Sequence, residues 1–183
     1  MTDWTKLTQN LEQRGFTVHR FATKEEAADY LDREIDGVSV AFGGSMTVQE
    51  MGLYPRLERH NDVLWHWNKD ALEKAAATDV YICSVNGLAE TGEIINIDGV
   101  GNRVASTIYG HKRVCFVVGR NKIAPDYDQA LWRAQNIAAP KNCQRLGLKT
   151  PCAVKADKCY NCSSPERSCR VLVVLWEKPR DVE

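Results

Sequence analysis

The chain of 183 residues contains no long uncharged apolar run. A membrane-spanning helix needs about 20 such residues, and residues 1–16 lack the apolar core of a secretory signal. We therefore expect a cytoplasmic protein that makes no membrane contact. In that compartment thiols stay reduced, so a group of cysteines points to metal binding or catalysis rather than to a disulfide framework.

An excess of charge of either sign is also missing. Lys plus Arg and Asp plus Glu each number 24, which gives a formal net charge of zero. No basic excess is present to pair with a phosphate backbone, so nucleic acid is not an expected partner. Low net charge does little to keep copies of the chain apart, and the sequence is therefore compatible with a homo-oligomer.

Several complete catalytic motifs are absent as well. The G-x-x-x-x-G-K-[ST] spacing of a phosphate-binding P-loop does not occur, and Val104 stands where the third glycine of a dinucleotide fingerprint would follow Gly99 and Gly101. The four histidines are scattered and form no serine–histidine–acid pattern. These absences argue against a P-loop nucleotidase, a Rossmann dehydrogenase and a triad hydrolase.

What is present is an alternation of apolar strands and amphipathic helices. Strands are expected at 38–42, 63–67, 79–85, 114–119 and 171–176, and the segment 86–98 is expected to form a turn followed by a further strand that carries Ile95 and Ile97 on one face. A helix with a T-x-x-E capping box starts at Thr23, and another over 126–139 should stop at Pro140. The alternation predicts an α/β fold, with a mostly parallel sheet flanked by helices, in a single domain over 1–183. The cysteine-rich segment 152–169 is expected to be a loop-like excursion from that domain.

Glycine-rich and polar loops follow the predicted strands, where open α/β sheets bind ligands. Gly43 and Gly44 allow close backbone approach to an anion, and Ser45 and Thr47 add hydroxyl donors; a tight strand-to-helix turn explains the same residues equally well. Further on, candidate ligand-binding side chains are Asp98, Asn102, Arg103, Asn121 and Lys122. An Arg fork suits a carboxylate or phosphate, although an Asp–Arg pair that ties a turn to a helix start is the alternative.

Glu93 is the one carboxylate that we single out as a nucleophile or general base, because it follows a glycine near a predicted strand end. No second catalytic group accompanies it in the sequence.

Four of the seven cysteines, Cys152, Cys159, Cys162 and Cys169, have the spacing C-x6-C-x2-C-x6-C. Four thiolates at such spacing can hold an iron–sulfur cluster of the 4Fe-4S type or, alternatively, zinc. A set of reduced thiols without metal is the third interpretation. Cys143 lies just before this segment and is a spare or substitute ligand.

The segments AFGGSMT, ETGEIINIDGVGNRVAS, GRNKI, AAPKNCQRL, TPC and CYNCSSPERSCRV occur in this order and together resemble the LUD domain family, whose members take part in lactate utilisation. The resemblance covers about residues 10–178. It implies a fold similar to that of sugar isomerases and CoA transferases, in which Gly43 to Thr47 form an anion loop. It also implies that Thr91, Gly92 and Glu93 form the second wall of a cleft.

Two functional hypotheses follow. In the first, the protein is a component of a redox system that oxidises L-lactate to pyruvate, binds a small carboxylate or phosphorylated metabolite, and works with iron–sulfur protein subunits. In the second, it is a non-catalytic metabolite-binding or scaffold subunit with a structural zinc or a reduced-thiol loop.

Overall fold

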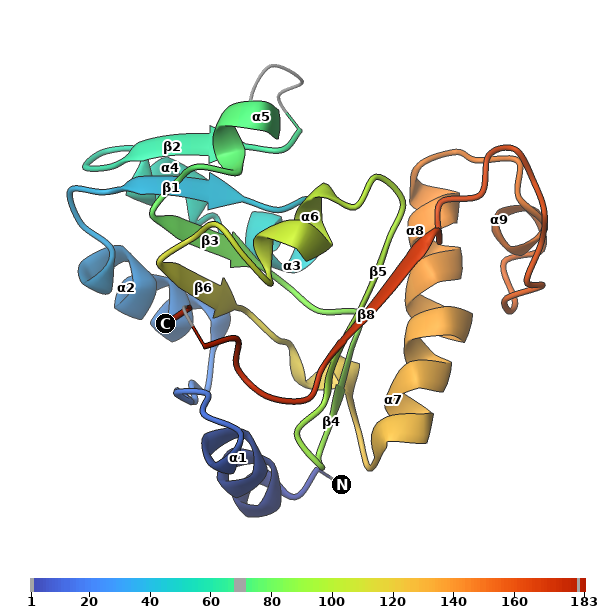
Figure 1. Cartoon of the computed structure of the whole chain (residues 1–183), viewed down its shortest axis with the longest axis horizontal. Helices are drawn as coiled ribbons and strands as arrows, with labels where there is room; N and C mark the ends of the chain where they lie inside the picture. The colour runs from blue at the N-terminus through green and yellow to red at the C-terminus, as the bar shows by residue number, and fades with distance from the viewer. Residues whose placement is uncertain (1, 68–71, 181) are drawn as a thin grey trace. The chain divides into compact units, whose positions relative to one another are not determined.

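The computed structural model describes residues 2–67, 72–180 and 182–183, which fall into two compact units. The first unit comprises residues 1–16, 85–104 and 119–178, and the second comprises 17–84, 105–118 and 179–183. Each unit is built around one four-stranded sheet (Figure 1). Strands and helices alternate as the sequence predicts, so the α/β class with a parallel sheet flanked by helices is confirmed.

The second unit holds a fully parallel sheet in the order β2-β1-β3-β6. Its elements are α2 (Lys24–Glu34), β1 (Ser39–Phe42), α3 (Met46–Glu50), α4 (Tyr54–Leu57), β2 (Asp62–Trp65), α5 (Leu72–Ala75), β3 (Val80–Cys83) and β6 (Arg113–Phe116). Thr23 caps α2 as predicted, because its hydroxyl accepts the N–H of Glu26 at 3.2 Å. Strand β6 is the last in the order of this sheet, although its continuous apolar run is typical of strands inside parallel sheets.

Helices cover both faces of this parallel sheet. On one face, Val40 and Ile82 pack with Leu31 of α2 and Val48 of α3. On the other face, Tyr81 and its neighbours pack with Ala75 of α5. Because both faces of the sheet are covered, the side chains on both sides of each strand must be apolar. This explains why all residues of β3 are buried.

The first unit holds a mixed sheet in the order β7-β4-β5-β8. Its elements are α1 (Trp4–Gln13), β4 (Gly87–Ala89), β5 (Ile94–Asp98), the 3-10 turn η2 (Arg120–Lys122), β7 (Ile123–Ala124), α7 (Tyr127–Arg133), the π-helical segment η3 (Ala134–Ala138), α8 (Ala139–Arg145), α9 (Pro151–Lys155) and β8 (Val171–Leu175). Helix α6 (Asn102–Ser106) begins here and ends in the second unit. Both β4 and β7 were missed in the sequence because each spans only two or three residues.

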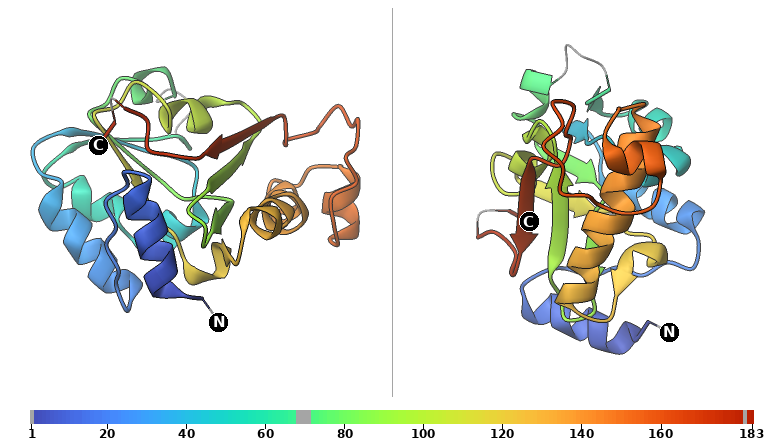
Figure 2. Two further views of the ribbon diagram at one scale, coloured as in Figure 1. Left: turned by 60° about the horizontal axis from the view of Figure 1, so that its bottom comes forward. Right: turned by 90° about the vertical axis from the view of Figure 1, so that its right-hand side faces the viewer.

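Strand β5 lies in the middle of this sheet. It pairs antiparallel with β4 and with β8, and Figure 2 shows β8 running alongside it. The long apolar run at 171–176, predicted as the last strand, is confirmed as β8.

The prediction that Pro140 stops the helix is wrong. The chain stays helical from Tyr127 to Arg145, and Figure 1 shows α7, the π-helical segment and α8 as one continuous rod. A proline inside a helix lacks a donor and crowds the preceding turn. The wider π turn just before Pro140 accommodates this, and the side-chain amide of Asn136 donates to the carbonyl of Trp132 at 3.0 Å. The expectation of a loop at 152–169 is also wrong at its start, since Cys152 lies in α9.

Gly87 sets how closely α7 approaches β4. A Cβ atom at this position would lie 2.5 Å from the carbonyl oxygen of Ala130. Backbone atoms cannot move aside as the end of a flexible side chain can, so only glycine fits. This close approach brings the turn after Ala130, which carries Arg133, next to the start of β4.

We expect Gly87→Ala to lower the free energy of unfolding by about 2–3 kcal/mol, the upper range for overpacking of a core. Urea denaturation measures this loss. Gly37→Ala is the matched control: Gly37 has a φ of 66° and no neighbour within 4 Å of an added Cβ, so only the backbone strain of about 1 kcal/mol applies. An equal loss in both variants would contradict the role given to Gly87.

Candidate functional site

Asn86, at the start of β4, connects several polar groups at one edge of the mixed sheet. Its side-chain oxygen accepts hydrogen bonds from the backbone of Ile97 at 2.8 Å and from Arg103 at 2.9 Å. Its backbone carbonyl accepts a hydrogen bond from Arg133. This one residue therefore links β5, α6 and α7.

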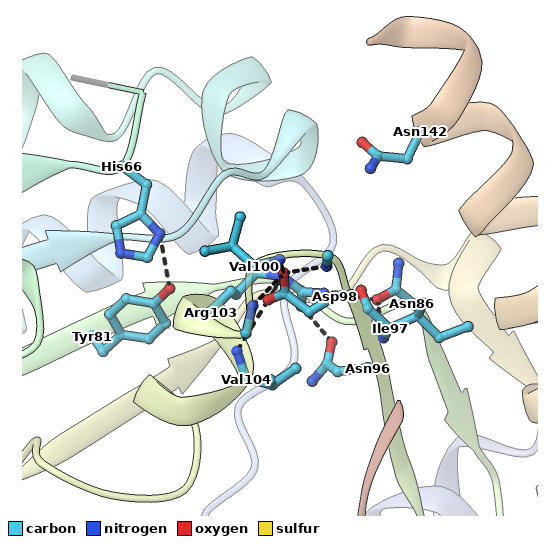
Figure 3. A network of polar contacts seen from close by, with 12 residues as sticks. His66, Tyr81, Asn86, Asn96, Ile97, Asp98, Val100, Arg103, Val104 and Asn142 are labelled. Carbon is cyan, nitrogen blue, oxygen red and sulfur yellow. Dashed lines mark hydrogen bonds and ion pairs between the residues drawn. The ribbon is translucent and has the colours of Figure 1, made fainter. Parts of the chain in front are cut away.

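Arg103 is largely buried and donates to three acceptors, as Figure 3 shows in part. They are the side-chain oxygens of Asn86 and Asn96 and the carbonyl of Ile97, at 2.9, 2.6 and 2.7 Å. Asp98 lies 3.8 Å from its Nε atom. The predicted Asp98–Arg103 pair thus exists, and the arrangement agrees with the alternative in which it ties a turn to the start of a helix.

Asp98 shapes the turn that follows β5. One carboxylate oxygen accepts the backbone N–H groups of Gly99, Val100 and Gly101 at 2.6–3.3 Å, and the other accepts that of Val104 at 3.2 Å. Gly101 has a φ of 96°, which favours glycine. The glycines that resemble a dinucleotide fingerprint therefore serve this turn.

Arg133 joins the edge from the last residue of α7. Its guanidinium donates to the carbonyls of Asn86 and of Asn121, the latter at 2.8 Å. Burial lowers the pKa of Arg133. Asp98 and Arg103 are thus linked, through Asn86 and Arg133, to the backbone carbonyl of Asn121. Asn102 is the first residue of α6, and Lys122 is the last residue of η2.

Sequence reasoning missed Asn86 and Arg133. Asn86 was assigned to the turn that precedes the predicted strand. Arg133 lies beside the buried positions Ala130 and Ala134. A cation at the border of an apolar helical face is the signal that could have identified it.

Glu93 lies in the turn that connects β4 to β5, whereas Asn86 and Asp98 lie at the other ends of these two strands. Arg14 donates to one of its carboxylate oxygens at 2.8 Å, and the hydroxyl of Thr91 donates to the other. Gly92 has a φ of 101°, and a Cβ atom there would lie 2.6 Å from the side chain of Arg14. The three residues form a compact turn around Arg14, and a catalytic role for Glu93 stays a prediction.

The loop Gly43–Thr47 belongs to the second unit. The N–H of Gly43 donates to the carbonyl of Ile82 at 2.9 Å, and the hydroxyl of Ser45 caps α3 by accepting the N–H of Val48 at 3.3 Å. A Cβ atom on Gly44 would lie 2.9 Å from the indole nitrogen of Trp67. These contacts explain the glycines and the serine as a tight strand-to-helix turn, and anion binding by this loop stays a prediction.

A chain of aromatic and polar side chains crosses the second unit near β3. The hydroxyl of Tyr81 lies 3.4 Å from Nδ1 of His66, a contact drawn in Figure 3. Tyr81 also stacks on His111, whose Nδ1 lies 2.8 Å from the carbonyl of Thr78. Burial lowers the pKa of His111, so this histidine is a neutral member of the core at pH 7.

The cysteines fall into a buried group and a more exposed group. Cys143 on α8 and Cys152 on α9 are 2% and 7% exposed and pack with Ala153. Burial and the neighbouring Cys152 raise the pKa of Cys143 to about 11, with a smaller contribution from Cys169. Cys159, Cys162 and Cys169 are partly buried in the loop after α9. Over residues 2–67, 72–180 and 182–183, no group of three or more His, Cys, Asp or Glu side chains is placed to hold a metal ion.

Comparison with known protein families gives one match over nearly the whole chain. The model of the LUD domain matches residues 4–182. The chain belongs to the LUD domain family. Membership implies a role associated with lactate utilisation. In the described part of this LUD domain no helix is long and apolar enough to cross a membrane.

No curated protein matches this LUD domain. Among solved structures, ribose 5-phosphate isomerase A from Neisseria gonorrhoeae is similar, with 13% identity and a TM-score of 0.42. The match covers 56% of this chain and about half, 53%, of the length of that protein.

We expect Glu93→Gln to lower the free energy of unfolding by about 1 kcal/mol, because the substitution removes the charge that pairs with Arg14 in a partly exposed setting. Thermal or urea denaturation measures the change. Glu12→Gln on the exposed side of α1 is the control and should be neutral. A stability unchanged by Glu93→Gln would show that the pairing with Arg14 contributes nothing to the turn.

Cys143 should be the slowest cysteine of the 143–169 region to react with iodoacetamide. A thiol with a pKa of about 11 is about 0.1% thiolate at pH 8, whereas an ordinary thiol is about a quarter ionised. We expect labelling slower by about 100-fold than that of an exposed thiol, measured by peptide mass spectrometry on chelator-treated, reduced protein. Labelling of Cys143 as fast as that of Cys162 in the folded chain, or slow labelling that persists after unfolding in urea, would contradict this.

Proposed function

We propose that the protein is a component of a redox system that oxidises L-lactate to pyruvate. In this proposal it binds a small carboxylate or phosphorylated metabolite and holds an iron–sulfur cluster on Cys152, Cys159, Cys162 and Cys169. Family membership supports the lactate-associated part. The observation that carries the redox part is the C-x6-C-x2-C-x6-C spacing of these four cysteines, all of which lie in the first unit.

The donor set fits a metal centre in its chemistry. Thiolates are the ligands that iron–sulfur clusters and zinc prefer. Cys152 sits at the end of a packed helix pair, and Arg167 fixes the following loop by donating to the carbonyls of Cys162 and Cys169 at 2.9 and 3.0 Å. An iron–sulfur cluster bound there would supply one-electron transfer.

Oxidation of L-lactate to pyruvate releases two electrons and two protons. A one-electron carrier must therefore pass electrons on singly to further acceptors. This requirement supports iron–sulfur protein subunits as partners of the chain.

One observation favours the second function, a non-catalytic metabolite-binding or scaffold subunit with structural zinc or reduced thiols. Both carboxylate oxygens of Glu93, the single catalytic candidate of the sequence, accept hydrogen bonds from within the first unit. A base held in this way must exchange Arg14 or Thr91 for a substrate before it can act.

Anaerobic purification followed by metal and acid-labile sulfide analysis separates these functions. We expect iron, sulfide and a broad visible absorption band that Cys159→Ser combined with Cys162→Ser removes. Cys115→Ala is the control, since Cys115 lies in β6 of the other unit, and should retain the metal.

Zinc without colour would support the scaffold function and exclude the redox carrier. A protein without any metal would exclude both metal-containing versions and leave the reduced-thiol loop.

A further inference from the structure

We propose that strand β8 is the interface of a homodimer, in which β8 pairs antiparallel with β8 of a second copy of the chain. The pairing is centred on Val173 and joins the mixed sheets of the two copies into one continuous sheet. The proposal concerns assembly, so it goes beyond the proposed function and does not depend on it.

The outer side of β8 is the first reason. β8 is the last strand in the order of the mixed sheet, and it pairs with β5 on one side (Figure 2). Neighbouring residues of a strand direct their N–H and C=O groups to opposite sides. About half of the backbone groups of β8 therefore point away from β5, where another strand can pair with them.

The hydrogen bonds of β5 identify the residues of β8 that face outward. The carbonyl of Ile95 and the N–H of Ile97 both bond to Asn86, on the side of β4. Asn96 lies between them and therefore faces β8, where Val173 is its partner. The two neighbours of Val173 direct their backbone groups away from the sheet, and in the described part of the chain no segment beyond β8 bonds to them. They are Leu172 and Val174.

β8 also lacks the features that usually protect an edge strand, namely charge, proline or short length. Residues 171–176 form the run VLVVLW, without charge or proline. Leu172 and Trp176 are 46% and 68% exposed. The strand at the other end of this sheet, β7, has only two residues. In the parallel sheet, the outer side of β6 is occupied, because Val114 donates its N–H to the carbonyl of Glu183 at 3.0 Å.

The charges at the two ends of β8 indicate that the partner is a second copy. Arg170 precedes the apolar run and Glu177 follows it, and both are exposed. Within the described residues neither forms an ion pair, and Arg170 donates only to backbone carbonyls. In an antiparallel pair the start of one strand meets the end of the other. Arg170 of each copy then lies beside Glu177 of the other, whereas a parallel pair would place like charges together.

The outward groups also select the register. When Val173 lies opposite Val173 of the other copy, Leu172 lies opposite Val174, and the outward N–H and C=O groups of both residues satisfy each other in two symmetric pairs. A register centred on Val174 would instead place Arg170 opposite Lys178, and like charges directly opposite each other are unfavourable. The formal net charge of zero adds no repulsion between the copies.

Sedimentation equilibrium of the reduced, full-length chain tests the interface. We expect a mass twice the 20.6 kDa of one chain. Leu172→Pro removes an outward N–H and leaves the bonds to β5 in place, a position at which an edge strand accepts proline. It should weaken dimerisation about 10- to 100-fold without loss of the circular dichroism of the fold. Leu172→Ile keeps the N–H and is the control, with unchanged dimerisation.

Two charge variants provide a test that does not depend on proline. Arg170→Glu and Glu177→Arg each place like charges at both ends of the pair, so each should weaken self-association about 10-fold. An equimolar mixture of the two variants restores opposite charges at both ends and should form a heterodimer with nearly the natural affinity. Arg59→Glu makes the same change of net charge on an exposed residue of the other unit and should dimerise as the natural sequence does.

Three outcomes would overturn the proposal. The first is a natural sequence that stays monomeric at about 100 µM, including a monomer that binds the strand of a different protein. The second is a dimer that a folded Leu172→Pro variant retains at full affinity, which would place the contact elsewhere. The third is a mixture of the charge variants that associates no better than either variant alone. None of these outcomes changes the metal analysis that tests the proposed function.

Discussion

The hydrogen bonds of Arg103 are the interaction on which the first unit depends most. A guanidinium that is largely withdrawn from water must find acceptors, because its charge cannot be neutralised by loss of a proton. Arg103 finds them on Asn86, Asn96 and Ile97, so the start of β4 and the end of β5 converge on α6. Removal of this one side chain would leave several buried polar atoms without partners at once, which is more costly than the loss of any one bond.

Much of this fold follows from apolar periodicity. The strands of the parallel sheet are continuous apolar runs, because helices cover both faces, and such runs are easily recognised. The short strands β4 and β7 and the helix beyond Pro140 were missed for a different reason. Their conformation depends on tertiary neighbours: α7 approaches β4 at Gly87, and a π turn accommodates the proline. Neither condition is visible in a local window of sequence.

The candidate site was predictable only where its residues are close together in the sequence. Asp98, Asn102 and Arg103 lie close together in the sequence, and the sequence correctly placed them at a strand end. Arg133 belongs to the same region only because α7 packs across the start of β4. The cysteines show the same limit, since spacing selects donors that are close along the chain, whereas Cys143 and Cys152 are neighbours because α8 and α9 pack together.

The π-helical segment lies between Arg133 and an anchor of the cysteine-rich loop that follows α9. Arg133 directly precedes this segment, and within it the side-chain oxygen of Asn136 accepts the backbone N–H of Cys159 at 3.2 Å. The π turn keeps the chain in one continuous helix across Pro140, and this helix carries both Arg133 and Asn136. The close packing of this helix on β4 at Gly87 therefore fixes the positions of both Arg133 and the anchor of Cys159.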